Sequence, residues 1–293
     1  MVEGRAAIAD PQRTELRTAD SESLALVDWS LPGSTQAETP ARAQVLMVHG
    51  LGEHSGRYAH VAARLCQRGF AVRGYDHHGH GRSSGGRGGI TGPMHLVDDL
   101  ARVVDATRAL VPDIPVILLG HSLGGLVCAS LVAHRMADAV HTVDALVLLS
   151  PLLGTELSGL QRLLLAVVPR LAPDLRVGNG VDVAFLSHDT AVVQAYRQDP
   201  LIHDRISGRL ARFITDQTAF VQAAAPRWNL PTLVLYAGDD RIVSPTATRA
   251  FAVAVPGDVA TAICFDTLYH EIFNELDAEP VFAHLIDWLD AHF

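Results

Sequence analysis

The chain has 293 residues, of which 48% are hydrophobic and 19% are charged, so it is long enough to bury a large core. Its formal net charge of −9 at pH 7 opposes binding to nucleic acid phosphates and steady attachment to anionic lipid. The sequence contains no lysine, which excludes Schiff-base enzymes and Walker-type phosphate loops, because both need a lysine amine.

Short apolar runs alternate with longer amphipathic segments along most of the chain, as in a mostly parallel sheet with helices on both faces. Two leading edge strands are expected near residues 14–18 and 24–29. The buried strands expected after them are 45–48, 70–75, 116–119, 145–150, 232–237 and 261–265. The expected helices are 58–68, 96–110, 123–136, 246–255 and 278–292. The pattern predicts an α/β fold in one compact domain.

The alternation breaks between about residues 151 and 226, where prolines and glycines interrupt helix-like segments. An insertion of this size predicts a helical cap over the C-terminal edge of the sheet, with residues 1–150 and 227–293 forming the core. Segment 157–171 of the cap is rich in leucine and valine. It either lines an acyl-chain pocket, or makes transient contact with a membrane surface, or only packs on the core.

The cysteines predict a reducing environment. Cys66, Cys128 and Cys264 are far apart and odd in number, so we expect three buried, reduced thiols. The first twenty residues are polar, and no apolar run approaches the ~18 residues of a membrane-spanning helix. We therefore expect a cytoplasmic protein.

The central chemical signal is the pentapeptide GHSLG at residues 120–124, which has the pattern G-x-S-x-G. An expected strand precedes it and an expected helix follows it, which is the context of the nucleophile elbow in the α/β-hydrolase fold. The flanking glycines are expected to permit the sharp turn, and the helix N-terminus favours developing negative charge. Ser122 is therefore the predicted nucleophile of an ester hydrolase; the alternative is a glycine-rich turn with an incidental serine.

A serine hydroxyl needs a base that takes its proton and an acid that orients the base. The chain order in this fold is serine, acid, histidine, so both partners lie downstream of Ser122. Asp239 and Asp240 follow the fifth buried strand, and their spacing does not choose between them. His270 follows the sixth buried strand and is the expected base.

Two backbone N–H groups should stabilise the oxyanion of the reaction. One is expected from Leu123, the residue after the nucleophile. The other is expected from Leu51, in the turn after strand 45–48, because its N–H follows the flexible Gly50.

Longer motifs accompany the pentapeptide. The chain reads HGLGEHSGRY at 49–58, YDHHGHGRS at 75–83, YRQDPLI at 196–202 and YHEIFNE at 269–275. Together they resemble the monoacylglycerol lipase and lysophospholipase family of α/β-hydrolases, from about residue 45 to the C-terminus. The resemblance implies cleavage of a fatty ester of glycerol through an acyl-enzyme, with no metal and no cofactor. It also implies that the acid is Asp240, directly before an arginine.

The resemblance leaves some roles open. Glu53, Arg57 and Tyr196 match polar positions of the family near the site, and serve either alcohol recognition or a structural ion pair. His78 departs from the family, which has arginine there. Its neighbours His77 and His80 raise the possibility of a zinc site. Because this run matches the family's glycine-rich loop, packing and hydrogen bonding are expected instead of a metal.

Other functions remain compatible with these residues. The same triad could serve a lysophospholipase, a broad short-chain carboxylesterase or a peptidase acting on small amines, because the fold hosts all of them. A binding module that has lost its chemistry is a further alternative, opposed by the presence of the whole catalytic set. A haloalkane dehalogenase or epoxide hydrolase is excluded, because it needs a carboxylate where this chain has Ser122. The oligomeric state and the acyl length stay open.

Overall fold

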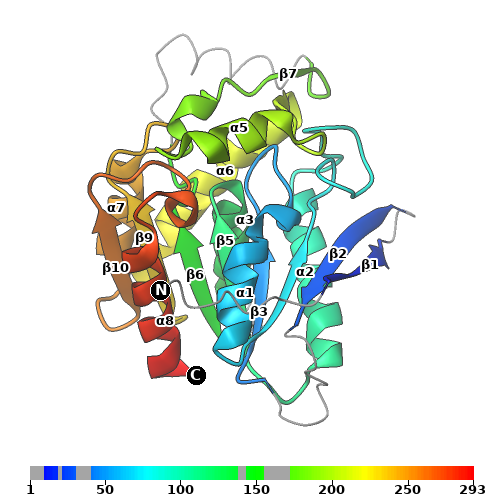
Figure 1. The fold of residues 1–293 in the computed structure, drawn as a ribbon. Helices are drawn as coiled ribbons and strands as arrows, with labels where there is room; N and C mark the ends of the chain where they lie inside the picture. The colour runs from blue at the N-terminus through cyan, green and yellow to red at the C-terminus, as the bar shows by residue number, and fades with distance from the viewer. Residues whose placement is uncertain (1–9, 19–21, 31–40, 138–142, 155–171) are drawn as a thin grey trace.

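An eight-stranded sheet forms the centre of the molecule (Figure 1). The computed structural model describes residues 10–18, 22–30, 41–137, 143–154 and 172–293. In chain order the strands of this sheet are β1 (Gln12–Arg17), β2 (Ser23–Trp29), β3 (Gln44–Val48), β4 (Ala71–Tyr75), β5 (Val116–His121), β6 (Ala145–Leu149), β9 (Thr232–Ala237) and β10 (Ala260–Phe265). Their spatial order is β1-β2-β4-β3-β5-β6-β9-β10. The β1–β2 and β2–β4 pairs are antiparallel and the other pairs are parallel, which confirms the predicted fold class.

Helices cover both faces of the sheet (Figure 1). Helices α1 (Ala59–Gln67) and α8 (Glu279–His292) pack on one face, while α2 (His95–Leu110), α3 (Leu123–Ala137) and α7 (Pro245–Ala254) pack on the other. Within β3, Val45 and Met47 face the first group of helices and Leu46 and Val48 face the second. This two-sided burial explains why the inner strands read as continuous apolar runs.

The described part of the chain between β6 and β9 lies over the end of the sheet at which the parallel strands terminate (Figure 1). Its described elements are β7 (Arg176–Gly178), the 3-10 helix η2 (Val183–Phe185), α5 (Thr190–Gln198), β8 (Arg205–Ser207), α6 (Gly208–Ala224) and the 3-10 helix η3 (Ala225–Arg227). Strands β7 and β8 form a small antiparallel pair. We propose that residues 151–226 form the cap and the remaining chain forms the core. The apolar segment 157–171 lies outside the described residues.

The cysteines differ in burial. Cys66 and Cys128 are buried, and burial raises the pKa of both thiols, that of Cys66 to about 11. Cys264 is exposed, so the expectation of three buried thiols is wrong for this residue. It lies on β10, the last strand of the sheet, which helices and neighbouring strands cover only in part. Among the described helices, none is long and apolar enough to cross a membrane.

Candidate active site

Ser122 occupies the sharp turn between β5 and α3. Its backbone φ is 53°, in the left-handed region that strains a residue with a side chain. Gly120 and Gly124, which were expected to supply the flexibility of this turn, have no positive φ. They supply space instead: a Cβ on Gly124 would lie 2.1 Å from the carbonyl oxygen of Val48, and one on Gly120 would lie 2.6 Å from that of Gly124. The strained residue is therefore the serine itself.

A buried histidine–aspartate pair lies at the ends of the last two strands. His270 Nδ1 is 2.7 Å from Asp240 Oδ2, and the two side chains are 3% and 1% exposed. The other oxygen of Asp240 accepts hydrogen bonds from two backbone N–H groups of the following turn, at 2.9 Å and 3.0 Å. Asp239 instead pairs with Arg241 at the surface. The structure therefore distinguishes the two aspartates, because Asp240 contacts His270 and Asp239 does not.

The charges of this pair shift its ionisation. Burial alone would raise the pKa of Asp240, but His270 and the two backbone amides lower it overall. Burial alone would lower the pKa of His270, but Asp240 raises it above its ordinary value of 6.5. Each partner thus favours the charged form of the other.

Strand β5 places His121, the residue directly before Ser122, against His270. The ring of His121, directly before the serine, lies 4.7 Å from the ring of His270 between centroids. His121 Nε2 is also 3.4 Å from the backbone oxygen of His270. Ser122 and the His270–Asp240 pair therefore belong to one site at the carboxyl ends of the parallel strands.

The two candidate oxyanion donors flank Ser122. Gly50 approaches the nucleophile turn so closely that a Cβ on it would lie 3.2 Å from the Cβ of Ser122. Leu51 follows this glycine, and Leu123 begins α3. Neither the Leu51 nor the Leu123 amide donates a hydrogen bond to another described residue. Both N–H groups are thus available to an oxyanion.

A buried carboxylate, Glu53, supports the turn that carries Leu51. Its Oε1 accepts hydrogen bonds from the Gly50 N–H and the Tyr58 hydroxyl, both at 2.7 Å. The same oxygen lies 3.3 Å from His121 Nδ1. Burial alone would raise the pKa of Glu53, but the Arg57 guanidinium and His121 hold it well below its usual range. Glu53 therefore links the oxyanion turn to the nucleophile strand.

Arg57 connects this carboxylate to the residue after the candidate base. Its guanidinium lies 2.5 Å from Glu53 and donates two hydrogen bonds to Glu271, at 2.6 Å and 2.7 Å. It also lies 4.8 Å from the ring centre of Tyr196, on α5 of the cap. Glu53 and Arg57 thus form the structural ion pair that was one of their two expected roles, and alcohol recognition stays a prediction. The contributions of Tyr58, His121 and Glu271 were missed, although all three lie within the quoted motifs.

The histidines of the run 77–80 are divided between two clusters. The first cluster comprises His49, His77, His80 and His203. The rings in contact within this cluster have centroids 4.5–5.9 Å apart, and burial lowers the pKa of all four histidines, that of His203 to about 4. His78 instead lies against His95 of α2, with ring centroids 4.3 Å apart. The three neighbouring histidines therefore do not converge on one point.

The strand order and the serine turn at the end of β5 define the class of this protein as a hydrolase of the α/β-hydrolase fold. The family model described as "Serine aminopeptidase, S33" matches residues 39–277. The chain therefore belongs to the serine aminopeptidase S33 family.

Individual relatives confirm the resemblance seen in the motifs. The monoacylglycerol lipase of Mycolicibacterium smegmatis is 31% identical over 259 residues, which cover 87% of this chain and 90% of that protein. The crystal structure of Paleococcus ferrophilus monoacylglycerol lipase has a TM-score of 0.79 at 30% identity, covering 97% of this chain and 100% of that one. An uncharacterized abhydrolase domain-containing protein of Dictyostelium discoideum is 32% identical over 94% of this chain, which spans only 28% of that protein.

Proposed function

We propose that this chain is a serine ester hydrolase that cleaves monoacylglycerols to fatty acid and glycerol through an acyl-enzyme on Ser122. The observation that carries the proposal is the buried His270–Asp240 pair beside a strained serine turn. The names of the Mycolicibacterium and Paleococcus relatives support a lipid ester as the substrate.

In the first step, Ser122 Oγ attacks the ester carbonyl carbon while His270 Nε2 takes the hydroxyl proton. Nε2 is the nitrogen left for this task because Nδ1 is held by Asp240. The raised pKa of His270 makes it a stronger base than a free imidazole and stabilises the imidazolium that forms.

The Leu51 and Leu123 amides donate hydrogen bonds to the oxyanion of the tetrahedral intermediate, where one such donor contributes ~3 kcal/mol. When the intermediate collapses, the ester C–O bond breaks and His270 returns the proton to the departing glycerol oxygen. A water molecule then attacks the acyl-enzyme and gives its proton to His270. Breakdown of this second intermediate releases the fatty acid and restores the Ser122 hydroxyl. These steps use only side chains, backbone amides and water.

The cap is proposed to contact the substrate. Tyr196 of α5 reaches the oxyanion turn, because its hydroxyl would lie 3.6 Å from a Cβ on Gly52. Among the three polar family positions it is therefore the best placed for alcohol recognition, while Glu53 and Arg57 are already engaged with each other. We further propose that the cap makes only transient contact with a membrane surface, in keeping with the net charge of −9. A cytoplasmic location is supported by the buried free thiols of Cys66 and Cys128.

A hydrolysis panel tests the proposed function. The purified chain and its Ser122→Ala variant are compared on monoacylglycerols of graded chain length, diacylglycerol, lysophosphatidylcholine, p-nitrophenyl butyrate and an amino-acid arylamide. A kcat/KM preference for monoacylglycerols that is lost in the variant is the expected result.

Each other outcome of the panel assigns another function. Preference for lysophosphatidylcholine makes the chain a lysophospholipase. Turnover of the butyrate alone makes it a short-chain carboxylesterase, and turnover of the arylamide makes it a peptidase. No turnover, together with no labelling of Ser122 by a fluorophosphonate probe, makes it a binding module.

A further inference from the structure

A second cluster of ligand-type side chains lies where three segments of the core meet. Glu22 precedes β2, His78 follows β4, and His95 and Asp99 lie one helical turn apart on α2. His78 Nδ1 is 2.7 Å from Glu22 Oε2. His95 Nε2 is 3.8 Å from the same Glu22 oxygen and 3.3 Å from Asp99 Oδ2. The ligand atoms of Glu22, His78 and His95 therefore lie within 4.8 Å of one another, and Asp99 adjoins this group through His95.

Two of these four atoms are buried and make no hydrogen bond with the described residues. They are His78 Nδ1 and Asp99 Oδ2, in side chains whose residues are 3% and 0% exposed. The Glu22 oxygen is near enough to His78 Nδ1 for a hydrogen bond, but it is not aligned with that nitrogen. Burying polar atoms without hydrogen bonds is costly, so a cluster that leaves two such atoms without a hydrogen bond points to a missing ligand.

We propose that Glu22, His78 and His95 bind a divalent transition-metal ion, for which zinc is the best fit, with the carboxylate of Asp99 beside His95. Two imidazole nitrogens and one carboxylate oxygen form a three-residue donor set that suits zinc, with water in the fourth position, and the charges of Glu22 and Asp99 balance that of the ion. Calcium and magnesium prefer sites made of oxygen atoms, so the two histidines disfavour them.

Neighbouring groups position the proposed ligands. Arg102 donates a hydrogen bond to Asp99 Oδ1 at 3.1 Å, which leaves Oδ2 to face His95. His95 Nδ1 lies 2.8 Å from the Thr91 hydroxyl oxygen and accepts a hydrogen bond from the Thr91 backbone N–H at 3.1 Å. Without an ion, His95 therefore carries its proton on Nε2. Coordination through Nε2 requires the other tautomer, in which Nδ1–H donates to the Thr91 hydroxyl and the Thr91 backbone N–H gives up its hydrogen bond to Nδ1.

The position of the cluster gives the ion a structural role. It would join the chain entering β2, the glycine-rich loop after β4 and the start of α2, none of which supplies a group to the mechanism proposed above. A link between segments that are distant in sequence stabilises the folded state, because the ion has no comparable site in the unfolded chain. The inference is therefore independent of the ester substrate.

The test measures zinc content and thermal stability of the full chain, not its activity. The protein is stripped with a chelator, dialysed, incubated with Zn²⁺, Mg²⁺ or Ca²⁺, and freed of loosely held ions by gel filtration. We expect one zinc per chain by mass spectrometry of the metal, and a Tm rise of about 5 °C with zinc in excess. Magnesium and calcium should produce neither effect.

Three variants identify the site. Glu22→Gln, at a half-buried position, and His78→Gln should lose the bound zinc and the Tm response, with their folding checked by circular dichroism. His284→Gln, which removes an exposed histidine of α8, is the matched control and should keep both. Failure of the wild-type chain to retain zinc overturns the proposal. Equal zinc retention by all three variants also overturns it, because the zinc would then be bound adventitiously elsewhere on the surface.

Discussion

Asp239 and Asp240 are identical side chains in consecutive positions, yet their surroundings give them opposite roles. Asp240 is buried, and its two oxygens are occupied by His270 and by backbone amides. Asp239 is 42% exposed in its ion pair with Arg241, and exposed pairs of this kind contribute little to stability. Only Asp240 is placed to orient a catalytic base.

Asparagine substitutions at these two positions provide a matched test. Asp240→Asn should lower kcat about 10⁴-fold, because the amide no longer holds His270 in the tautomer with a free Nε2. Asp239→Asn should stay within about twofold of the wild-type kcat, because it alters only a surface pair. The measurement is kcat on a soluble ester. Equal losses in the two variants would contradict the assignment of Asp240.

The pH profile of kcat/KM reports the charge of His270. The ring acts as a base only when neutral, and its pKa is raised above 6.5 by Asp240. Activity should therefore be lost as the pH falls through a midpoint above 6.5. In Asp240→Asn the residual activity should show a lower midpoint, because the neighbouring negative charge is gone. A wild-type midpoint below 6.5 would argue against this pair as base and acid.

The catalytic role of a residue could be predicted from the sequence where the order of catalytic residues along the chain restricts the candidates. Ser122 and His270 follow from their places after strands. The environment of each aspartate depends on the turn after β9, so spacing left both open. The network of Glu53, Arg57 and Glu271 depends on side chains from distant segments, which a sequence pattern does not bring together.

At the scale of elements, the junction of β5 and α3 requires glycines, because a side chain at these positions would overlap neighbouring backbone atoms. A methyl group on Gly124 would overlap the carbonyl oxygen of Val48, which is backbone of the central strand β3 and cannot move aside. By contrast, a Cβ on Gly92 meets nothing within 4 Å, and this glycine has no positive φ. The two glycines therefore differ in packing.

Alanine substitutions at these positions test the point. Gly124→Ala should destabilise the fold by about 1–3 kcal/mol through overpacking, and should also lower kcat because α3 carries the Leu123 amide. Gly92→Ala should leave the free energy of unfolding within about 0.5 kcal/mol of wild type. Urea denaturation gives both values. If Gly124→Ala leaves the free energy of unfolding unchanged, α3 can shift to accept the methyl group without loss of stability.

Element prediction succeeded where burial was two-sided and failed where elements were short. The buried runs in β3, β5, β6 and β9 identified the inner strands, because helices cover both of their faces. Strands β7 and β8 of the cap have three residues each and no apolar alternation, so no local pattern indicated them.

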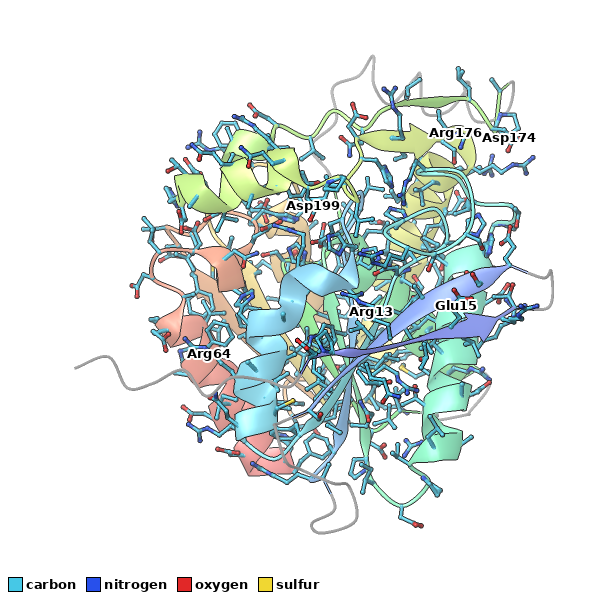
Figure 2. The ribbon with its side chains drawn as sticks, turned by 45° about the vertical axis from the view of Figure 1, so that its right-hand side comes forward. Arg13, Glu15, Arg64, Asp174, Arg176 and Asp199 are labelled. Carbon is cyan, nitrogen blue, oxygen red and sulfur yellow. The ribbon has the colours of Figure 1, made fainter. Side chains whose placement is uncertain are left out.

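At the scale of the whole molecule, the cap is attached to the core by polar contacts. Asp199, at the end of α5, lies between cap and core in Figure 2, and its carboxylate is 2.9 Å from His54 Nε2. The His203 N–H donates to the Gly52 carbonyl at 2.9 Å, beside the oxyanion turn. Asp174, at the outer edge of the cap in Figure 2, pairs with Arg209 at the surface.

Limited proteolysis measures how firmly these contacts hold the cap. Asp199→Ala should be cleaved several-fold faster than wild type within residues 172–204, because local opening of the cap costs less without the contact to His54. Asp174→Ala removes a solvent-exposed pair and should be cleaved at about the wild-type rate. Identical cleavage rates in the two variants would mean that other contacts hold the cap.

Whole-molecule organisation was only partly accessible from the sequence. The insertion of the cap after β6 could be predicted from the loss of alternation near residue 151. The convergence of Glu22, His78 and His95 could not, because it depends on how the chain before β2 packs against α2. The sequence therefore predicted no metal, whereas the structure leads us to propose one.

The cluster of four histidines, three buried and one half-buried, also causes the chain to take up protons when it unfolds in acid. His49, His77, His80 and His203 have lowered pKa values in the folded state, so unfolding lets them take up protons once the pH falls below 6.5. Folding free energy is then lost as acidity rises, by up to about 5 kcal/mol per pH unit if all four titrate together. As the pH falls, the enzyme should therefore respond in two stages. It first loses activity reversibly near neutrality, because His270 becomes protonated, and at lower pH it unfolds. In an acidic compartment the enzyme would therefore be inactivated and then unfold.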